Sequence, residues 1–376
     1  MKPIYLDYNA TTPVAEPVLE AMLPFLNQHY GNPSSNHPMG RAAAEAIEDA
    51  RMLVAATIGA DREEIFFTSG GTESNNLAIH GLLMDAPSGS HVITSQIEHP
   101  AVLEPMKWLE QRGFHISYVR SNRDGVIEPG AIKAALHPDT RLVSIMHANN
   151  ETGAIQPLAE IAQLLEDRDV ALHTDAAQSL GKIPVQVDEL GVDLLSIAGH
   201  KCYAPKGVGA LYVRFGTLLH PLLCGAAQER GLRPGTENVA GIVGLGRACQ
   251  LLTKRTEESL RQIGTWRDHL AELLLAEIPE LQINAARVER LPNTLSVVFP
   301  KVAGHDLLQR AHGIYASTGS ACHSGLGSRS ATLENLGLDV ETARGTVRLS
   351  LGWHTTADEI SLAADALIAA WQSLIQ

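Results

Sequence analysis

Residues 196–201 read Ser-Ile-Ala-Gly-His-Lys and close an apolar run, residues 192–197, that has the composition of a buried strand. Lys201 therefore follows a strand directly, after a glycine and a histidine. A lysine in this place is usually a solvated loop residue. The chemical alternative is covalent, because a lysine amine can form a Schiff base with an aldehyde cofactor.

A second strand-like run, residues 170–172, leads into His173-Thr174-Asp175-Ala176-Ala177-Gln178. An aspartate at a strand end can keep a pyridine nitrogen protonated, which makes the ring an electron sink. Taken alone, Asp175 would be a turn residue or a helix cap. Taken together, Asp175, Gln178, His200 and Lys201 have the composition of a ligand set for pyridoxal 5′-phosphate (PLP).

Apolar runs alternate with helix-like segments through the first two thirds of the chain. Strands are expected at residues 65–68, 92–94, 116–119, 142–146, 170–172, 193–197 and 209–213, and helices at 17–26, 41–58, 73–83, 101–111, 129–136 and 158–166. This alternation predicts an α/β fold with a mostly parallel sheet that is buried on both faces. Ligands bind such sheets at the carboxyl ends of the strands, where Asp175 and Lys201 fall.

The length of 376 residues predicts two subdomains. A long helical stretch at about 237–278 should link the large domain to a smaller α+β domain. Strands of that domain are expected at 294–299 and 346–351, followed by a helix at 357–374. The arm of residues 1–12 is expected to pack with the small domain.

The composition describes a soluble globular protein, with 45% hydrophobic and 19% charged residues. A net charge of -13 disfavours nucleic acid and anionic membranes as partners. The N-terminus does not resemble a signal peptide, so we expect a cytoplasmic protein with reduced cysteines. Its four cysteines have no metal-like spacing, and no metal is expected.

The segment Thr68-Ser69-Gly70-Gly71-Thr72-Glu73 lies between a predicted strand and a predicted helix. Its two glycines let the backbone approach an anion, and the free N–H groups at a helix start attract phosphate. Thr72 can add a hydroxyl donor. An ordinary helix N-cap is the simpler interpretation of this weak motif, which matches neither a Walker A loop nor the dinucleotide fingerprint.

Three further residues could contact a bound cofactor or substrate. His99 follows a strand and could stack on a flat ring, although a cap-region histidine is the simpler interpretation. Asn150, in Asn-Asn-Glu-Thr-Gly, could donate to a ring hydroxyl or a carboxylate, although the segment by itself predicts a turn. Arg348, in the alternating strand Thr-Val-Arg-Leu-Ser-Leu, could clamp a carboxylate or face solvent.

Cys322 stands among small polar residues and glycines, in Thr-Gly-Ser-Ala-Cys-His-Ser-Gly-Leu-Gly. This setting predicts an exposed, flexible thiol that could act as a nucleophile when it is ionised. Cys202, Cys224 and Cys249 are instead expected to be small buried hydrophobes.

These segments together resemble the NifS/IscS-type cysteine desulfurases, which are class V aminotransferase-like, fold type I PLP enzymes. The resemblance covers essentially the whole chain. The matching segments are residues 5–12, 31–35, 69–76, 98–99, 149–153, 175–178, 199–201, 233–238, 320–322 and 348–350.

The resemblance implies a large PLP domain over residues 14–255 with a mostly parallel seven-stranded sheet. Residues 1–13 and 256–376 would form the smaller α+β domain, with a catalytic-cysteine loop at about 318–332. The implied reaction converts L-cysteine to L-alanine and leaves a persulfide on Cys322. That sulfur would pass to an acceptor protein, such as an Fe–S scaffold or a thiolation enzyme.

The resemblance also implies a role for each matching position. Lys201 would form the Schiff base, Asp175 would hold the pyridine nitrogen, and His99 would stack on the ring. Gln178 would contact the ring hydroxyl, and the phosphate would bind Gly71, Thr72 and His200. Asn150 and Arg348 would hold the substrate carboxylate. Thr236 would reach the phosphate in the neighbouring subunit of a homodimer.

Three positions depart from the family pattern. Many relatives have serine in place of Ala198 and a second arginine in place of Trp353, and His323 replaces a commoner threonine-containing sequence. Ala-Cys-His-Ser also resembles selenocysteine lyases, so release of selenium from L-selenocysteine is the alternative activity. A class V aminotransferase fits the sequence less well because it does not need Cys322. A non-catalytic scaffold on a PLP fold is disfavoured because Asp175, Lys201, Arg348 and Cys322 are all intact.

The first prediction concerns the lysine that carries the cofactor. The purified protein should be yellow with PLP, and borohydride reduction followed by peptide mapping should place the label on Lys201. A label on Lys182 or Lys206 would contradict the assignment of the site.

Overall fold

The computed structural model describes residues 3–255, 257–318 and 329–376. Within these residues the strands form three sheets. The largest has seven strands in the order β2-β8-β7-β6-β5-β3-β4, and all its pairs are parallel except those of β8. The predicted α/β fold with a mostly parallel seven-stranded sheet is therefore confirmed.

The strands of the large sheet match their predicted positions closely. They are β2 (Ile65–Thr68), β3 (His91–Ser95), β4 (His115–Val119), β5 (Thr140–Ser144), β6 (Ala171–Asp175), β7 (Leu194–Ala198) and β8 (Gly209–Val213). The prediction for β5 was shifted by two residues toward the C-terminus. Ile145 and Met146 are fully or almost fully buried, so hydrophobicity alone extended the predicted strand past the last ladder pair.

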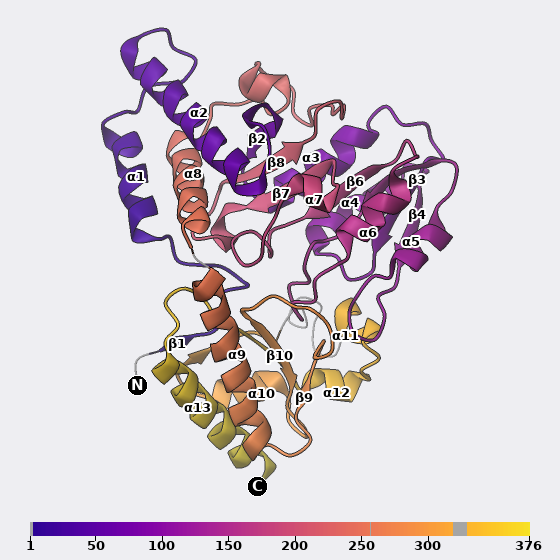
Figure 1. The fold of residues 1–376 in the computed structure, drawn as a ribbon, viewed down its shortest axis with the longest axis vertical. Helices are drawn as coiled ribbons and strands as arrows, with labels where there is room; N and C mark the ends of the chain where they lie inside the picture. The colour runs from indigo at the N-terminus through magenta and orange to yellow at the C-terminus, as the bar shows by residue number, and fades with distance from the viewer. Residues whose placement is uncertain (1–2, 256, 319–328) are drawn as a thin grey trace.

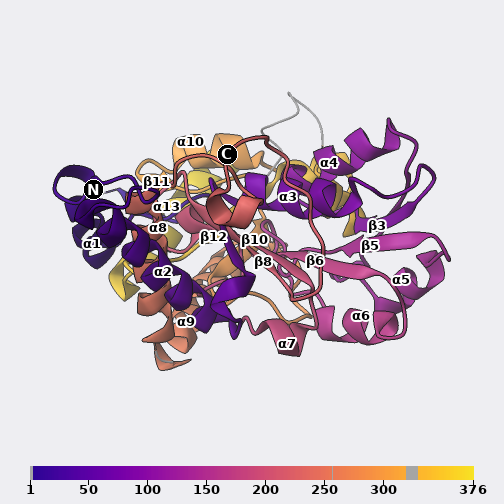
Figure 2. The same cartoon turned by 90° about the horizontal axis from the view of Figure 1, so that it is seen from above.

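Helices cover both faces of this sheet (Figures 1 and 2). One face carries α3 (Gly71–Leu83) and α4 (Pro100–Glu110), which pack with Val92 and Leu142. The helices of the other face are α1 (Glu16–Asn27), α2 (Pro38–Ile58), α5 (Pro129–Ala135), α6 (Leu158–Leu165), α7 (Val187–Leu190) and α8 (Val239–Thr253). The buried parallel strands therefore present their polar carboxyl ends as the place where a ligand can bind.

A second hydrophobic cluster lies below the large sheet in Figure 1. Its antiparallel sheet has the order β12-β10-β9. The elements of this part are β9 (Gln282–Ile283), β10 (Thr294–Val298), β12 (Thr346–Ser350), α9 (Glu257–Glu277), α10 (Gly304–Arg310), α11 (Ala331–Asn335), α12 (Val340–Arg344) and α13 (Ala357–Ile375). The single helical stretch predicted at 237–278 is two helices, α8 and α9. The exact domain boundaries, at 14 and 255, stay a prediction.

The N-terminal arm runs between these two hydrophobic clusters. Strand β1 (Ile4–Tyr5) pairs with β11 (Ile314–Tyr315), and Ile4 and Leu6 are buried in the second cluster. Tyr8 is instead buried with the large-sheet cluster. The arm thus packs with the small part, as expected, and then crosses to the carboxyl edge of the large sheet.

A buried ion pair fixes the segment that follows β8. Arg51 donates from Nη1 and Nη2 to the two carboxylate oxygens of Glu229, at 2.7 Å each, and Phe67 N donates to Glu229 Oε2 at 2.7 Å. Glu229 and its neighbour Arg230 both have left-handed backbone angles, with φ of 45° and 54°. Non-glycine residues seldom adopt that conformation, so the bidentate pair holds a turn that the backbone alone disfavours.

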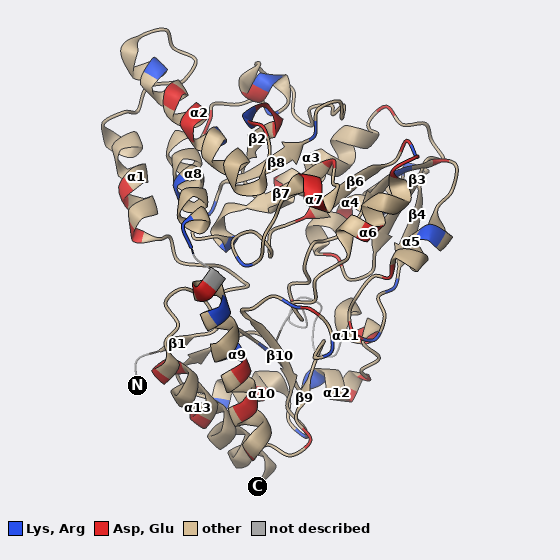
Figure 3. Ribbon diagram, viewed as in Figure 1, with Lys and Arg blue, Asp and Glu red and all other residues tan. Residues whose placement is uncertain are grey.

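Figure 3 shows acidic residues on several helices, including α1, α2, α9 and α13. Within the described residues no helix combines the length and the apolar composition needed to cross a lipid bilayer.

Candidate active site

A cavity of about 300 Å³ opens at the carboxyl edge of the large sheet. Its lining includes most of the residues assigned to cofactor binding from the sequence: Gly71, Thr72, His99, Asp175, Gln178, His200 and Lys201, together with Asn150. Strands β6 and β7 are adjacent and parallel, and Asp175 is paired with Ser196. This register brings Asp175 and the residues after β7 to one edge, as the sequence predicted.

Asp175 is only 7% exposed, and it accepts two hydrogen bonds. Asn75 Nδ2 donates to its Oδ2 at 2.7 Å and Ala177 N donates to its Oδ1 at 2.9 Å. Both contacts orient the carboxylate in the cavity wall. Asn75 lies in the matched segment 69–76 but was not assigned a role, because an asparagine inside a helix gives no local sign of its partner.

The first turn of α3 forms one end of the cavity. Gly70, the N-cap, has φ 148° and ψ -179°, a conformation that essentially only glycine adopts. A Cβ on Gly71 would lie 3.1 Å from the Cβ of Ala198, a tight contact, so a larger residue here would crowd this part of the wall. The N–H groups of the first helical turn have no intrahelical acceptors and favour an anion. This geometry suits a phosphate group.

Two histidines flank the cavity in fixed orientations. His99 is the N-cap of α4, and its Nδ1 accepts a hydrogen bond from Ala101 N at 3.1 Å. His200 Nδ1 lies 3.2 Å from Thr11 Oγ1. Burial, then the charges of Lys201, Lys206 and His99, lower the pKa of His200 to about 4, so it is a neutral hydrogen-bonding group at neutral pH.

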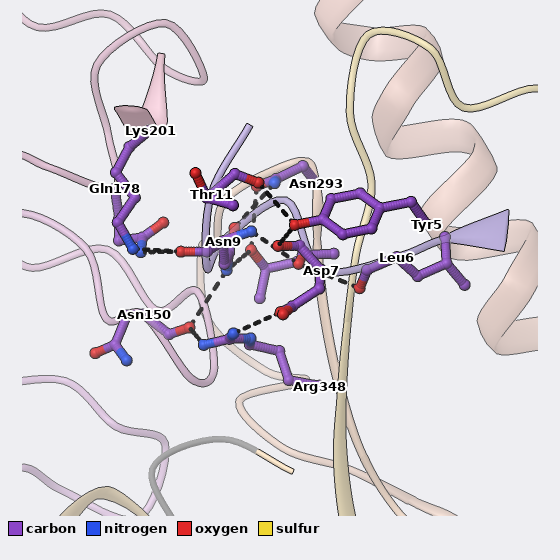
Figure 4. Close-up of polar contacts among 12 residues, drawn as sticks. Tyr5, Leu6, Asp7, Asn9, Thr11, Asn150, Gln178, Lys201, Asn293 and Arg348 are labelled. Carbon is purple, nitrogen blue, oxygen red and sulfur yellow. Dashed lines mark hydrogen bonds and ion pairs between the residues drawn. The ribbon is translucent and has the colours of Figure 1, made fainter. Parts of the chain in front are cut away.

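Lys201 closes the cavity from the short helical turn after β7, residues Gly199–Lys201. Its amine donates to the main-chain oxygen of Asn9 at 2.6 Å, and Gln178 Nε2 donates to the same oxygen at 3.0 Å (Figure 4). Burial, then the charge of Arg348, lowers the pKa of Lys201 to about 8. A lysine with this pKa can serve as a nucleophile and a proton acceptor near neutral pH.

Arg348 approaches the site from β12 without lining the 300 Å³ cavity. It donates from Nη2 to Asp7 Oδ1 at 2.8 Å and from Nη1 to Asn150 O at 2.9 Å (Figure 4). Its buried Nε has no hydrogen-bond partner among the described residues. The guanidinium is therefore tied to Asp7, a partner that the sequence did not reveal, and still has donor capacity for a carboxylate.

Asn9 connects most of these groups, although nothing in its local sequence predicts such a role. It is fully buried, and its side chain donates to Thr294 Oγ1 at 2.9 Å and to Asn150 O at 3.3 Å. The segment Tyr-Asn-Ala-Thr-Thr was part of the family pattern. Only the three-dimensional structure shows that this residue reaches both subdomains.

The remaining predicted residues lie elsewhere. Thr236 is exposed, in the segment between the turn at Gln228–Gly231 and α8, and does not line this cavity. Cys322 and His323 fall in residues 319–328, outside the described part of the chain. Among the other cysteines, Cys202 and Cys249 are buried as expected. Cys224 is exposed, so that prediction was wrong, because the residue lies in an irregular surface segment after β8.

Two of the three positions that depart from the family pattern, Ala198 and Trp353, lie in the described part of the chain. Ala198 ends β7 and lines the cavity beside Gly71, where a serine would place a hydroxyl. The Trp353 indole stacks on Tyr203, with ring centroids 3.6 Å apart and an interplanar angle of 16°. Arg255 lies over the same indole at 4.6 Å. Trp353 is thus a packing residue between the two clusters.

The residues of the cavity fit PLP. An anion cradle, a carboxylate on an adjacent strand end and a desolvated lysine face one space of suitable size. The buried Asn75 Oδ1 has no hydrogen-bond partner among the described residues and lies beside Asp175. It could accept a hydrogen bond from a ligand or a water in the cavity.

Comparison with known proteins agrees with this geometry. The aminotransferase class-V family model matches residues 4–362. A cysteine desulfurase IscS from Dictyoglomus turgidum is 47% identical over 367 residues, which cover 97% of this chain and 93% of the relative. A solved NifS-like protein superposes with a TM-score of 0.93 at 38% identity, covering 99% of this chain and 100% of its own. The structure of SspA in complex with cysteine superposes with a TM-score of 0.84 at 38% identity, and the match covers 92% of this chain and 98% of that one.

The second prediction concerns the protonation of Lys201 in protein freed of cofactor. The labelling rate of its amine by a neutral acylating reagent should rise with a midpoint near pH 8. In Arg348→Met the midpoint should move upward, because one cation is lost and Asp7 is left unpaired. Peptide mass spectrometry measures both, with the exposed Lys133 as the reference for reagent reactivity.

The same shift should change the pH dependence of stability. Between pH 8 and 10.5 the unfolded chain holds a proton on Lys201 that the native state lacks, so the free energy of unfolding should rise with pH in this window. A labelling midpoint near pH 10.5 for Lys201 in the native protein would show that the pKa of its amine is not lowered, which would contradict both predictions.

Proposed function

This chain belongs to the aminotransferase class-V family, and we propose that it is a PLP-dependent cysteine desulfurase whose chemistry is performed by Lys201, Cys322 and the residues of the 300 Å³ cavity. It converts L-cysteine to L-alanine and transfers the sulfur to an acceptor. The single observation that carries the assignment is that Asp175, the α3 N-terminus and Lys201 meet at one edge of the large sheet. The similarity of the chain to a cysteine desulfurase, over almost its whole length, supports the same assignment.

Each residue of the cavity has a role in this proposal. Gly71, Thr72 and His200 hold the phosphate, Asp175 pairs with the ring nitrogen, His99 covers the ring and Gln178 contacts its hydroxyl. Lys201 binds the cofactor covalently. When it is bound, PLP supplies an electron sink for the substrate Cα.

The protein's own groups then carry the proton and the sulfur. Asn150 and Arg348 bind the substrate carboxylate, and the Lys201 amine accepts the proton from Cα. The Cys322 thiolate forms an S–S bond with the substrate sulfur as the Cβ–S bond breaks. The electron pair stays with Cβ, which takes up a proton, and Lys201 returns a proton to Cα to give alanine, while the persulfide remains on Cys322.

The role of Cys322 rests on its sequence setting and on the family pattern. A thiol that attacks must be reduced, which agrees with the cytoplasmic location expected from the sequence. Fe–S scaffolds and thiolation enzymes are the acceptors that the family pattern suggests.

The third prediction separates desulfurase from selenocysteine lyase chemistry. Cys322→Ser should lose alanine formation from L-cysteine by at least about 100-fold, because no thiolate receives the sulfur, while the yellow colour from PLP at Lys201 is kept. L-selenocysteine should retain some turnover, since selenium can leave without that attack. Alanine release from both substrates, measured side by side, provides the test.

Two outcomes would contradict the proposal. Wild-type turnover of cysteine by Cys322→Ser would exclude the persulfide step. Wild-type protein that cleaves selenocysteine and ignores cysteine would establish the lyase activity instead.

We also propose that the enzyme is a homodimer in which Thr236 donates to the phosphate in the partner's site. Its exposure and its position outside the cavity of its own chain support this role. A two-fold arrangement would place the same surface on both subunits.

The fourth prediction is a complementation experiment. Lys201→Ala and Thr236→Val are each expected to be strongly impaired. In a mixed dimer of the two variants, both substitutions fall in the same composite site. The other site then has an intact Lys201 from one subunit and an intact Thr236 from its partner, so activity should be recovered there. Activity after subunit exchange, with sedimentation to establish the dimer, measures this. No recovery from mixed dimers, or a fully active monomer, would show that Thr236 serves its own chain.

A further inference from the structure

Lys182 is a second lysine beside the site, and the proposed mechanism does not use it. It follows Gly181 in a turn after β6, and together with Lys201, Tyr203 and Trp353 it lines a second, small pocket. Burial, then the charges of Lys201 and Arg348, lowers the pKa of its amine well below 10.5. Among the described residues, no carboxylate forms an ion pair with it. Lys182 is partly buried, and an amine withdrawn from water without a counter-charge is unfavourable, so its hydrogen bonds need an explanation.

Its two hydrogen bonds both go to oxygen atoms of site residues. Lys182 Nζ donates to Gln178 Oε1 at 2.7 Å and to Asn9 Oδ1 at 3.1 Å. Because the Gln178 carboxamide oxygen accepts the hydrogen bond from Lys182, the Gln178 Nε2 is directed to the Asn9 main-chain oxygen, at 3.0 Å. Lys201 Nζ donates to that same oxygen at 2.6 Å.

The orientation of the Gln178 amide decides what the cavity offers to a ligand. An amide has a donor end and an acceptor end, and nothing in its shape distinguishes them. With the oxygen held by Lys182 and one N–H of Nε2 bonded to the Asn9 main-chain oxygen, the second N–H of Nε2 is the donor left for the cavity side, where Gln178 is part of the lining. The reversed amide would present a carbonyl oxygen to the ring oxygen of the cofactor, and the two acceptors would repel each other.

We propose that Lys182 is a positioning residue, whose amine fixes the Gln178 amide so that the donor end of Gln178 faces the cofactor. This inference rests on the proposed function, since it assigns a cofactor to the cavity. Lys182 lines the neighbouring small pocket and is not part of the lining of the 300 Å³ cavity.

The fifth prediction uses a double-mutant cycle. Lys182→Met keeps the apolar stem and removes the donor, and it should weaken PLP binding roughly tenfold because a buried carbonyl oxygen loses its partner. In the Gln178→Leu background the same substitution should have little further effect, since Lys182 acts through Gln178. Equilibrium dialysis gives the dissociation constants, and Lys133→Met on α5 is the matched surface control.

Two further measurements distinguish positioning from general structural support. The visible absorbance maximum of the bound cofactor should shift in the same direction in Lys182→Met and Gln178→Leu. Lys182→Gln, which keeps an N–H donor, should recover part of the affinity. Should Lys182→Met fail to fold, Lys182→Gln takes its place in the cycle. Its affinity for PLP is expected to lie between the affinities of the wild type and of Gln178→Leu.

Additive losses in the double variant, or wild-type affinity and spectrum in Lys182→Met, would overturn the inference while leaving the proposed function intact. Failure of the wild-type protein to bind PLP would instead overturn the proposed function itself, and the two failures are therefore distinguishable.

Discussion

The constraint on which the site depends is the placement of Asn9 between the two hydrophobic clusters. Its main-chain oxygen accepts from Lys201 and Gln178 of the large sheet, and its main-chain N–H donates to Ser350 Oγ of β12 at 2.9 Å. Its side chain also contacts Asn293 and Thr294. One fully buried residue thus ties the carboxyl edge of the large sheet to the sheet that carries Arg348. Because the backbone groups involved are buried, each needs its partner, and the arm cannot shift without leaving several of them unsatisfied.

The electrostatics of the site follow from desolvation acting on an excess of basic groups. Lys201, Lys182 and Arg348 face Asp175 and Asp7, and burial is the largest cause of the lowered pKa of each lysine. The nearby Glu98 is buried too, and burial raises its pKa to about 8, although it accepts from Ser95 Oγ at 2.6 Å and Met146 N at 3.0 Å. Asp175 lines the cavity itself, whereas Glu98 lies outside its lining. An anionic ligand is favoured by this balance.

The sequence predicted the large sheet and its ligand-binding edge because both depend on local signals. Alternating apolar runs mark the strands, and Asp175, Gly71 and Lys201 each follow one directly. What escaped prediction depends on contacts between distant segments. Asn9 and Asp7 belong to the site only because the arm crosses from one cluster to the other, and Lys182 looks like an ordinary turn residue until its neighbours are known. The ion pair between Arg348 and Asp7 joins residues at opposite ends of the chain, and no periodicity encodes it.

The buried pair between Arg51 and Glu229 has a consequence for assembly. It holds the left-handed turn at Glu229 and Arg230, and a little further on Arg233 donates to Glu73 of α3 at 2.8 Å. The segment that leads to Thr236 is therefore shaped within its own chain, by contacts to β2 and to the start of α3. In the proposed dimer the two subunits would meet as preformed surfaces, with little loop entropy to lose on association. Subunit exchange would then resemble rigid docking, and it would be governed by the rate of dissociation more than by refolding of the loop.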